Sequence, residues 1–482
     1  MFGFFPILFA LFLGLSLAYL LLKFFNKKKY ENLPHGNMGW PIFGETLEFL
    51  KPHSSNSMGS FLQERCFRYG KVFKSHLFGA PTIVSCDLEL NMFILQNEGK
   101  LFETSYPKPI HGILGKYSLL LVSGDLHKKL RNIVVSFSSS SKSTPEFLHW
   151  VEKLSISTMD SWKNRREVSF FKEAKTFTMS IMVKHLLSIK PEEPLAAEIL
   201  HDFETYMKGF VSLPLYIPGT AYTKAVKARE RLSSTVKEII EKRERGNAGV
   251  ANEGEDFLDV ILSKQKLSDE EMVSIVLDIL LGGYETTSTL MALIVYFLGH
   301  SPNSFQTLKE EHQAIAENKN EDEALNWEDY KKMQFTYHVI WEAMRCGNVV
   351  KFVHRKALQD VKFKGIVIPS GWKVLPMFTA AHFDLSIHDK PLDFNPWRWI
   401  HDKEMGKKVT PFGGGPRLCP GAELAKVVIA VFLHHLVLNY SWKTKAEDIP
   451  LALPYVEFRR GLSMEILPTN YERINVKRRR SP

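Results

Sequence analysis

The hydrophobic pattern of the chain begins with an unbroken apolar run. No charged side chain occurs in the first 22 residues, MFGFFPILFALFLGLSLAYLLL. As a helix this run is about 33 Å long, which is enough to cross the core of a bilayer. Positive residues follow in NKKK at 26–29, and they favour keeping the rest of the chain in the cytoplasm. A cleaved signal peptide is the alternative, but no basic segment precedes the run. We therefore predict a membrane anchor over residues 1–25 and a basic linker rich in proline and glycine over residues 26–45.

Beyond the linker, the apolar positions mostly follow a helical period. Two stretches predict small strand pairs, KVFKSHLFGAPTIVSC near 71–86 and VKFKGIVIPSGWKVLP near 361–376. The polar stretches SFSSSSKST (136–144) and ERGNAGVANEGED (244–256) are predicted to be loops. No internal repeat is found in the sequence. The pattern predicts a mainly α protein, with one large helical domain and a small β-sheet subdomain.

Charge and cysteine content exclude several classes of function. The net charge is +9, but three excess charges lie at 27–29 and four at 477–480, so the body of the chain is close to neutral. This placement argues against nucleic acid as a partner and is typical of solvated ends near a membrane. The cysteines form no C-x-x-C pair, which argues against a zinc cluster and a disulfide framework. They are Cys66, Cys86, Cys346 and Cys419.

Cys419 lies in an unusual setting, PFGGGPRLCPG (411–421). The glycines at 413–415 let backbone amides approach the sulfur, and the helical pattern that begins near residue 421 points its N-terminal dipole toward it. Both features favour a thiolate, the form of cysteine that binds haem iron. A phosphate-binding loop is excluded, because the Lys-Ser/Thr pair it requires is absent. A glycine-rich turn around a buried cysteine remains the alternative when this stretch is considered alone.

The same stretch carries a family motif. Phe412, Gly415, Arg417, Cys419 and Gly421 match F-x-x-G-x-R-x-C-x-G, and over residues 33–467 the chain resembles the cytochrome P450 monooxygenases. The resemblance implies the P450 fold, with residues 46–482 as the catalytic domain on the cytosolic side of the endoplasmic reticulum membrane. It also implies haem b with Cys419 as the axial ligand to iron, and electrons from NADPH by way of a flavoprotein, NADPH-cytochrome P450 reductase.

Two further motifs of the family follow in order. Glu342 and Arg345 in WEAMR match its E-x-x-R pair, and Arg398 in FNPWRW matches the downstream arginine that joins the pair. The resemblance implies a buried network with a structural role. In DILLGGYETTSTL, Glu285 and Thr286 match the acid–alcohol pair that delivers protons during oxygen activation. Close helix packing is the other explanation of the paired glycines in this helix.

The resemblance also implies where the haem, the reductase and the substrate bind. The expected haem contacts are His127, Arg131, Arg355 and Arg417, which would hold the propionates, and Phe412 and Gly413 in the cysteine loop. Many relatives carry tryptophan at the position of His127. The expected reductase-docking residues are Lys128, Lys129 and Lys426. The expected substrate-pocket residues are Ile110, Leu121, Leu281, Gly282, Val349, Val350, Phe352 and Leu462.

Finer features are similar to plant enzymes that oxidise sterol side chains in brassinosteroid and steroidal-saponin biosynthesis, the sterol C-22 hydroxylases above all. They lie at 213–229, 345–358, 368–376 and 417–426. The expected activity is hydroxylation of a sterol of the campesterol or cholesterol type, with C-22 favoured. A triterpenoid oxidase and a steroid hydroxylase acting at another carbon are the near alternatives. A haem-dependent isomerase or dehydratase and a non-catalytic sterol- or haem-binding protein belong to other classes.

Overall fold

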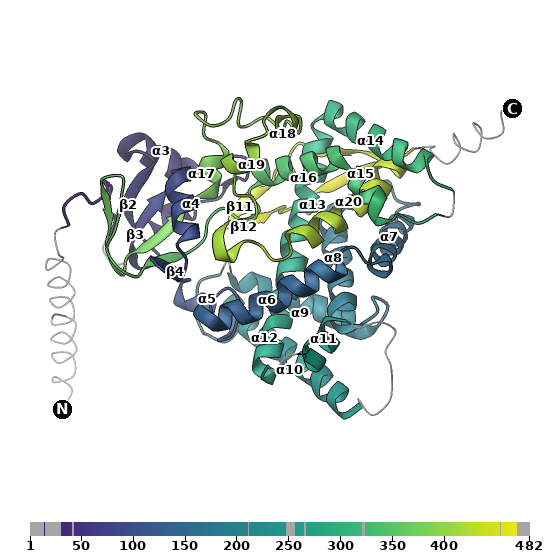
Figure 1. Ribbon diagram of the computed structural model, residues 1–482, viewed down its shortest axis with the longest axis horizontal. Helices are drawn as coiled ribbons and strands as arrows, with labels where there is room; N and C mark the ends of the chain where they lie inside the picture. The colour runs from purple at the N-terminus through teal and green to yellow at the C-terminus, as the bar shows by residue number, and fades with distance from the viewer. Residues whose placement is uncertain are drawn as a thin grey trace.

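A computed structural model describes residue 14 and residues 30–469, apart from gaps at 41–42, 211, 247–255, 265–266, 321–322 and 454. The predicted anchor, the first part of the linker and the basic C-terminal end therefore lie outside the described residues, except for Gly14. The prediction of a large helical domain with a small β subdomain is confirmed (Figure 1).

Helices form most of the described chain. They are α2 (Thr46–Phe49), α3 (Ser60–Tyr69), α4 (Leu88–Gln96), α5 (Lys108–Leu114), α6 (Gly124–Ser141), α7 (Pro145–Asp160), α8 (Phe170–Leu187), α9 (Pro194–Phe210), α10 (Ala221–Gly246), α11 (Phe257–Lys264), α12 (Asp269–Leu281), the π-helical turn η1 (Gly282–Thr286), α13 (Thr287–Gly299), α14 (Pro302–Glu317), α15 (Trp327–Lys332), α16 (Gln334–Gly347), α17 (Phe378–His382), α18 (Arg398–His401), α19 (Met405–Lys408), the 3₁₀ turn η2 (Gly415–Arg417) and α20 (Ala422–Asn439).

The strands form four small sheets. The largest has the order β2-β3-β9-β6-β4, from β2 (Val72–Leu77), β3 (Ala80–Ser85), β9 (Lys373–Pro376), β6 (Arg355–Ala357) and β4 (Phe102–Thr104). The others are β7 (Val361–Phe363) with β8 (Ile366–Ile368), β1 (His53–Ser54) with β11 (Leu451–Leu453) and β12 (Tyr455–Glu457), and β10 (Tyr440–Thr444) with β13 (Ser463–Pro468) and β5 (Glu167–Ser169). Both predicted strand regions are confirmed, since β2 pairs with β3 and β7 pairs with β8.

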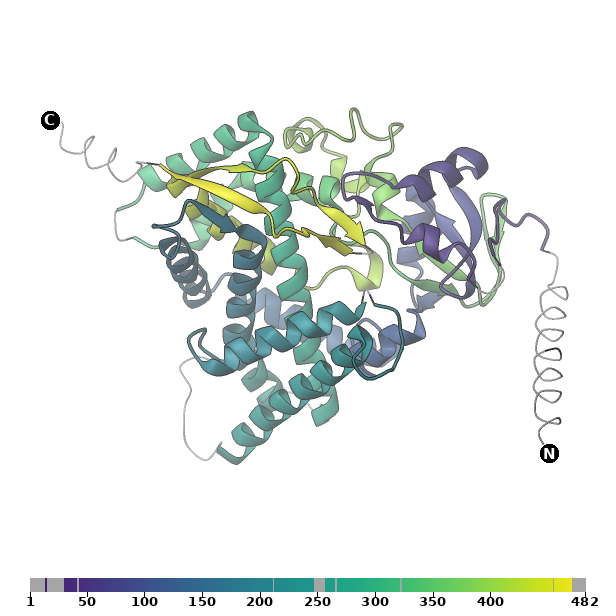
Figure 2. The same cartoon turned by 180° about the vertical axis from the view of Figure 1, so that it is seen from behind.

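One long apolar element passes through the middle of the helical domain. It consists of α12, η1 and α13, and it packs against α8, α16 and α20 (Figure 2). Among the described residues, two stretches are long and apolar enough to span a membrane, Asp269–Gly299 and Ala422–Asn439. Most of each is buried within the protein, as expected for the core helices of a folded domain.

The serine run departs from the predicted loop. Residues 136–141 form the last part of α6, and the loop is limited to the residues between Ser141 and Pro145. Phe137 is buried in the main core and anchors this turn. The hydroxyls of Ser140 and Ser141 donate to the Phe137 carbonyl at 3.0 and 2.8 Å. These serine hydroxyls therefore have hydrogen-bond partners within the helix itself. Of the other predicted loop, residues 244–246 belong to α10, and 247–255 lie outside the described residues.

Candidate active site

The cysteine loop is shaped by glycines at positions where no other residue fits. Gly413 and Gly415 have φ angles of +77° and +63°. A Cβ atom at Gly415 would lie 2.0 Å from the carbonyl oxygen of Leu95, at the end of α4. The loop closes through a hydrogen bond of 3.0 Å from the Cys419 backbone N–H to the Phe412 carbonyl. These constraints hold Cys419 immediately before α20.

The surroundings of the Cys419 sulfur determine how readily it loses its proton. Its side chain is exposed, although burial among surrounding protein atoms raises the pKa of the thiol. Two groups act in the opposite direction and favour the thiolate, the backbone N–H of Gly421 and the guanidinium of Arg131. The N-terminal end of α20, which begins at Ala422, adds positive potential on the same side. The loop thus presents an exposed sulfur beside groups that favour its thiolate form, the form that binds a metal centre.

A second exposed region interrupts the long core helix. Gly282 and Thr286 are exposed in η1, although Tyr284 and almost all of α13 are buried. No protein atom lies within 4 Å of a Cβ built at Gly282, whereas one built at Gly283 would lie 2.4 Å from the Met182 sulfur. The two glycines therefore have different functions: Gly283 allows close packing against α8, and Gly282 borders open space.

The loop between α5 and α6 connects this helix to the cysteine loop. Asp278, one turn before Gly282, accepts hydrogen bonds from Ser118 Oγ at 2.8 Å and from Leu119 N at 2.5 Å. The Leu119 carbonyl accepts in turn from Arg417 at 3.1 Å. Burial raises the pKa of Asp278 to about 7, against the opposing effect of these two hydrogen bonds. Helix and cysteine loop are thus fastened to the same connecting segment.

The structure brings the four predicted propionate ligands into one cluster. His127 is buried, and burial together with the neighbouring Arg417, Arg131 and Arg355 lowers its pKa to about 4. The two later arginines share one carboxylate, since each has its Nε 2.6 Å from an oxygen of Glu98. Three guanidinium groups against one carboxylate leave an excess of two positive charges, which matches the two propionates of haem.

The members of this cluster differ in how many donors they have available. Arg417 also donates to the carbonyl oxygens of Leu119 and Val122, so it mainly braces the connecting segment. Arg131 has no hydrogen-bond partner within the part of the chain that the structure describes. The donor set therefore fits haem, with Arg131 and Arg355 as the groups most available to an incoming carboxylate.

The E-x-x-R residues form a fully satisfied buried network. Glu342 accepts from Arg345 Nη2 at 2.8 Å and Nε at 3.0 Å, and from Arg398 Nε at 3.3 Å. It also accepts from the Asn395 backbone N–H and the Trp399 indole N–H, both at 3.0 Å. Arg345 uses its remaining donors on main-chain carbonyl oxygens, those of His382, Pro391 and Asp393. A buried ion pair is tolerated only under such conditions.

The acid–alcohol pair lies on the π-helical turn. The Thr286 hydroxyl donates to the Gly282 carbonyl at 2.5 Å. The carbonyl of Tyr284 accepts from the Thr178 hydroxyl of α8 at 3.2 Å, so the widened turn keeps its polar groups satisfied. The Glu285 carboxylate pairs with the amine of Lys175 on α8 at 3.1 Å. The hydroxyl is exposed on the open side of the helix, and the carboxylate is held beside it.

These features define the class of the protein, a haem-thiolate protein of the cytochrome P450 fold. Residues 34–470 match the family model "Cytochrome P450", and the chain belongs to that family. It is 57% identical over 96% of both chains to "Cytochrome P450 724B1" of Oryza sativa subsp. japonica. It is 46% identical to "Cholesterol 22-monohydroxylase CYP90B52" of Paris polyphylla, over 91% of this chain and 94% of that one. The solved structure "Retinoic acid bound cyanobacterial CYP120A1" matches with a TM-score of 0.80 and 25% identity, over 91% of this chain and all of that one.

Membership of this family makes the protein a monooxygenase with haem as its cofactor and a reductase as its electron donor. When bound, thiolate-ligated haem supplies the activation of O₂ by electrons from the reductase.

The predicted substrate-pocket residues fall into two groups. The first group has at least partly exposed side chains. In it, Gly282 and Val350 are exposed, Val350 by 45%, and five other residues are partly buried. Those five are Ile110, Leu121, Leu281, Val349 and Phe352. Leu462 does not belong with them. It is fully buried in the main core, and its carbonyl accepts from the Phe170 backbone N–H, so it packs the fold rather than lining a recess.

The prediction for Lys426 as a reductase-docking residue is wrong. Its side chain is 10% exposed, pairs with Glu423 at 2.5 Å and lies over the ring of Trp341 at 5.3 Å. Helical position alone could not reveal this, because long lysine stems pack on aromatic rings wherever the neighbours allow it. Lys128 and Lys129 are exposed on α6.

Two functional side chains were missed in the sequence. Glu98 joins Arg355 to Arg417, and Lys175 holds Glu285. Neither residue lies in a recognised motif. Both are also far in sequence from their partners, by more than two hundred residues for Glu98 and about a hundred for Lys175. The only available signal was the need of a buried cluster of arginines for an anion, which names no position.

Proposed function

We propose that this monooxygenase hydroxylates the side chain of a plant sterol, with C-22 as the favoured position and campesterol- or cholesterol-type sterols as substrates. Relatives named as cholesterol 22-monohydroxylase and steroid (22S)-hydroxylase cover most of the chain at 46% and 43% identity and support this proposal. The test is product identification from microsomes that contain the protein and NADPH-cytochrome P450 reductase, fed a panel of sterols. Products oxidised only on the rings, or no sterol product at all, would refute it.

The roles of the site residues form part of the proposal. Cys419, in the loop that contains Phe412 and Gly413, would supply the thiolate ligand of haem, while His127, Arg131, Arg355 and Arg417 would hold its propionates. Glu342, Arg345 and Arg398 brace the loop. Thr286 presents a hydroxyl proton at the open face of its helix, and Glu285 exchanges protons with water.

An oxygen-independent isomerase or dehydratase built on the same fold is the competing class. Such an enzyme has no need for delivered protons, so the presence of both Glu285 and Thr286 favours monooxygenation. Product formation that requires NADPH and O₂ supports the proposal, whereas turnover without either would establish the competing class.

Thr286→Ala is expected to bind haem and sterol normally but to lose most of its product yield. The hydroxyl that donates to the Gly282 carbonyl is removed, so protons are misdirected and reducing equivalents leave as hydrogen peroxide. The measurement is the ratio of product to NADPH consumed, which we expect to fall about tenfold or more. Thr289→Val, a buried threonine of the same helix, serves as the control and should keep the wild-type ratio. An unchanged ratio in Thr286→Ala would remove this hydroxyl from the mechanism.

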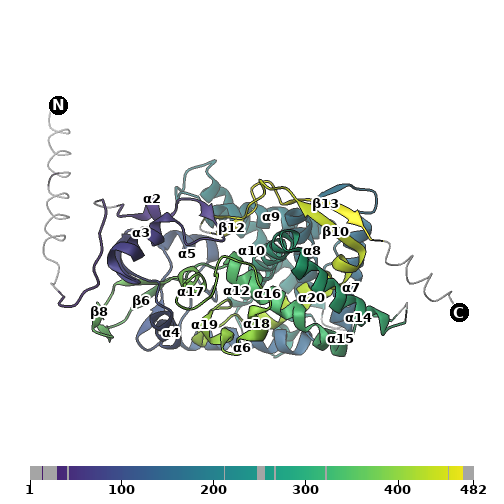
Figure 3. The same cartoon turned by 90° about the horizontal axis from the view of Figure 1, so that it is seen from above.

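Lys128 and Lys129 are proposed to receive the reductase. Both are exposed on α6, which also carries His127 and Arg131, and Figure 3 places α6 on the opposite side of the molecule from α2. Neutralising both as glutamine should slow reduction several-fold at low ionic strength, and the difference should vanish at high salt. Lys364→Gln, on the distant β7–β8 turn, is the control. Equal stopped-flow reduction rates at low salt would refute this docking face.

Val350→Ala tests the substrate pocket. The side chain is 45% exposed, in the segment between the buried E-x-x-R helix and Arg355. Its truncation therefore enlarges the proposed substrate pocket without removing core packing. Since positioning decides which carbon reacts, the ratio of hydroxylated products should change by several-fold while thiolate ligation persists. Chromatographic product ratios provide the measurement. A wild-type ratio combined with wild-type sterol affinity would place the pocket elsewhere.

Membrane attachment at the endoplasmic reticulum, by a single span over residues 1–25, is proposed from the apolar run and the basic residues that follow it. Exposed apolar side chains on two separate segments support contact between the folded domain and a bilayer. They are Trp40, Phe43 and Leu47 around α2, and Leu213, Leu215, Tyr216 and Ile217 between α9 and α10.

A further inference from the structure

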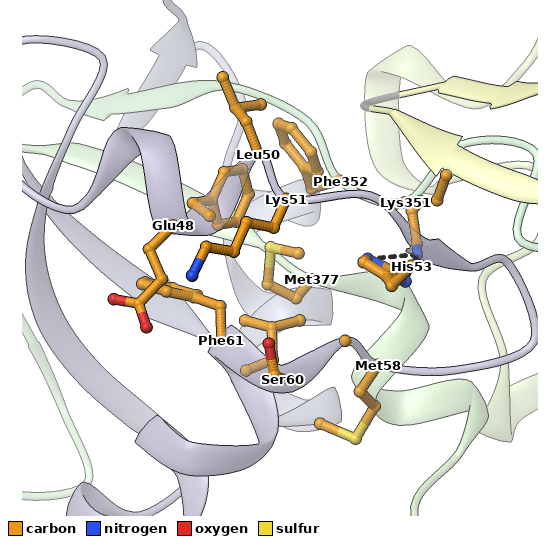
Figure 4. Close-up of a pocket in the computed structure, with 14 residues that line it drawn as sticks. Glu48, Leu50, Lys51, His53, Met58, Ser60, Phe61, Lys351, Phe352 and Met377 are labelled. Atoms are coloured by element: carbon orange, nitrogen blue, oxygen red, sulfur yellow. Dashed lines mark hydrogen bonds between the residues drawn. The ribbon is translucent and has the colours of Figure 1, made fainter.

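A buried lysine without a carboxylate partner lies beside a small apolar cavity. Lys351 is 6% exposed, and its amine is 3.1 Å from Nε2 and 3.3 Å from Nδ1 of His53 (Figure 4). His53 Nδ1 is also 2.9 Å from the Ser54 carbonyl oxygen, so it carries the proton of the ring and leaves Nε2 as the acceptor for the lysine. Within the described chain, no acidic group pairs with Lys351.

Such an arrangement is costly unless a ligand uses it. An ammonium group that is removed from water without an anion loses several kcal/mol of hydration. Burial lowers the pKa of Lys351 to about 7, and burial together with Lys351 lowers the pKa of His53. His53 is the side-chain partner of the amine, so at least one N–H of the lysine remains able to donate to a further polar group.

The cavity limits the size and chemistry of that group. Its volume is about 30 Å³, where one water molecule needs roughly 10–15 Å³ by the same measure, so a small polar group such as a hydroxyl fits beside the amine. Apart from the lysine–histidine pair, the wall is mainly apolar. The apolar wall residues are Phe49, Leu50, Met58, Phe61, Leu62, Phe352, Met377 and Ala452.

The position of the cavity relates it to both the membrane side and the haem side. Its wall includes α2 and β1 residues, next to the exposed apolar side chains around α2, and Figure 3 shows α2 and β12 on the same side of the molecule. Lys351 also follows Val350 and precedes the proposed propionate ligand Arg355 by four residues, so their Cα atoms are at most about 14 Å apart. A rigid sterol has its hydroxyl and its side chain at opposite ends.

We infer that Lys351, held in place by His53, binds the ring hydroxyl of the sterol substrate. This inference rests on the proposed function. The hydroxyl end is fixed at the cavity, the ring system lies along the segment that contains Val350 and Phe352, and the side chain is presented to the haem. The distance between this polar anchor and the iron then determines which side-chain carbon reacts.

The test compares sterols that differ only at this hydroxyl. Spectral titration of the holoenzyme gives the dissociation constants of cholesterol and of its methyl ether, which cannot donate and is larger at the same oxygen. Wild type is expected to bind cholesterol about tenfold more tightly than the ether, as one hydrogen bond to a charged or strongly polar group provides. Lys351→Met, similar in length and apolar, should bind the two sterols with nearly equal affinity and give altered side-chain regiochemistry.

The control is Lys319→Met, which removes another lysine with a buried side chain. Lys319 follows α14 and pairs with Asp329 of α15. The control variant should keep the wild-type preference for the alcohol. Equal loss of affinity for both sterols in Lys351→Met would show that Lys351 only stabilises the local fold through its contact with His53 of β1. That result would overturn the inference.

If Lys351→Met does not form a haem-thiolate complex, the wild-type comparison decides alone, because equal affinity for alcohol and ether excludes a hydroxyl anchor. Failure of the wild type to bind or oxidise any sterol is a different outcome and would refute the proposed function itself.

Discussion

Cys419→His is expected to abolish the thiolate-type Soret band of the ferrous carbon monoxide complex. Burial raises the pKa of the Cys419 thiol, while the Gly421 N–H, the Arg131 guanidinium and the start of α20 act in the opposite direction and favour the thiolate. Imidazole is neutral and larger, so it loses these interactions and cannot donate electron density to iron as a thiolate does. Monooxygenase activity should fall below detection in the same preparation.

The matched control is Cys66→Ser, since Cys66 is a partly buried thiol on α3, outside the cysteine loop. It should keep the wild-type spectrum and activity. A thiolate-type band that survives in Cys419→His would mean that another cysteine binds the iron. The assignment of Cys419 as the iron ligand would then be wrong.

Glu342→Gln should destabilise the protein by about 3–5 kcal/mol, because it leaves Arg345 buried without a counter-charge. Asn395 and Trp399 donate to different oxygens of the carboxylate, so the NH₂ group of the glutamine would face one of these two donors in either orientation. The measurement is the free energy of unfolding in urea, followed together with the haem spectrum, since both the network and the cysteine loop should be lost in one transition.

Glu423→Gln provides the comparison for that experiment. Glu423 also pairs with a basic residue, Lys426, but its side chain is 53% exposed. We expect its loss to cost less than about 1 kcal/mol. Equal costs for the two variants would contradict the view that the E-x-x-R network carries a structural burden.

The parts of the site that were predictable are those where chemistry restricts residue types at short spacing. The turn at Gly415 tolerates no Cβ, and the E-x-x-R pair needs one helical turn between its members, so both leave a fixed pattern in the sequence. The same holds for the strand pairs, where alternation marks the buried face. Glu98 left no such pattern, because its two arginine partners meet it only through the fold.

The errors have a common physical origin in tertiary context. The serine run was expected to be a loop, yet Phe137 anchors it in the core and the serines bond back to the helix. Lys426 was expected on the surface, yet its side chain is 10% exposed and its amine lies over the rings of Trp341 and Tyr337. Leu462 was expected in the pocket and is part of the core. In each case the side chain would suit either environment, so neighbours distant in sequence decided the outcome.

The two adjacent glycines of η1 have an evolutionary consequence. An alanine at 283 would lie 2.4 Å from the Met182 sulfur, so the Met182 side chain on α8 has to change its conformation to accept it. An alanine at 282 meets no protein atom within 4 Å, so it can be accepted without disturbing the helix. The two neighbouring positions therefore differ in evolutionary freedom. A change at 282 affects only the free space beside the helix, whereas a change at 283 also requires a side chain of α8 to move.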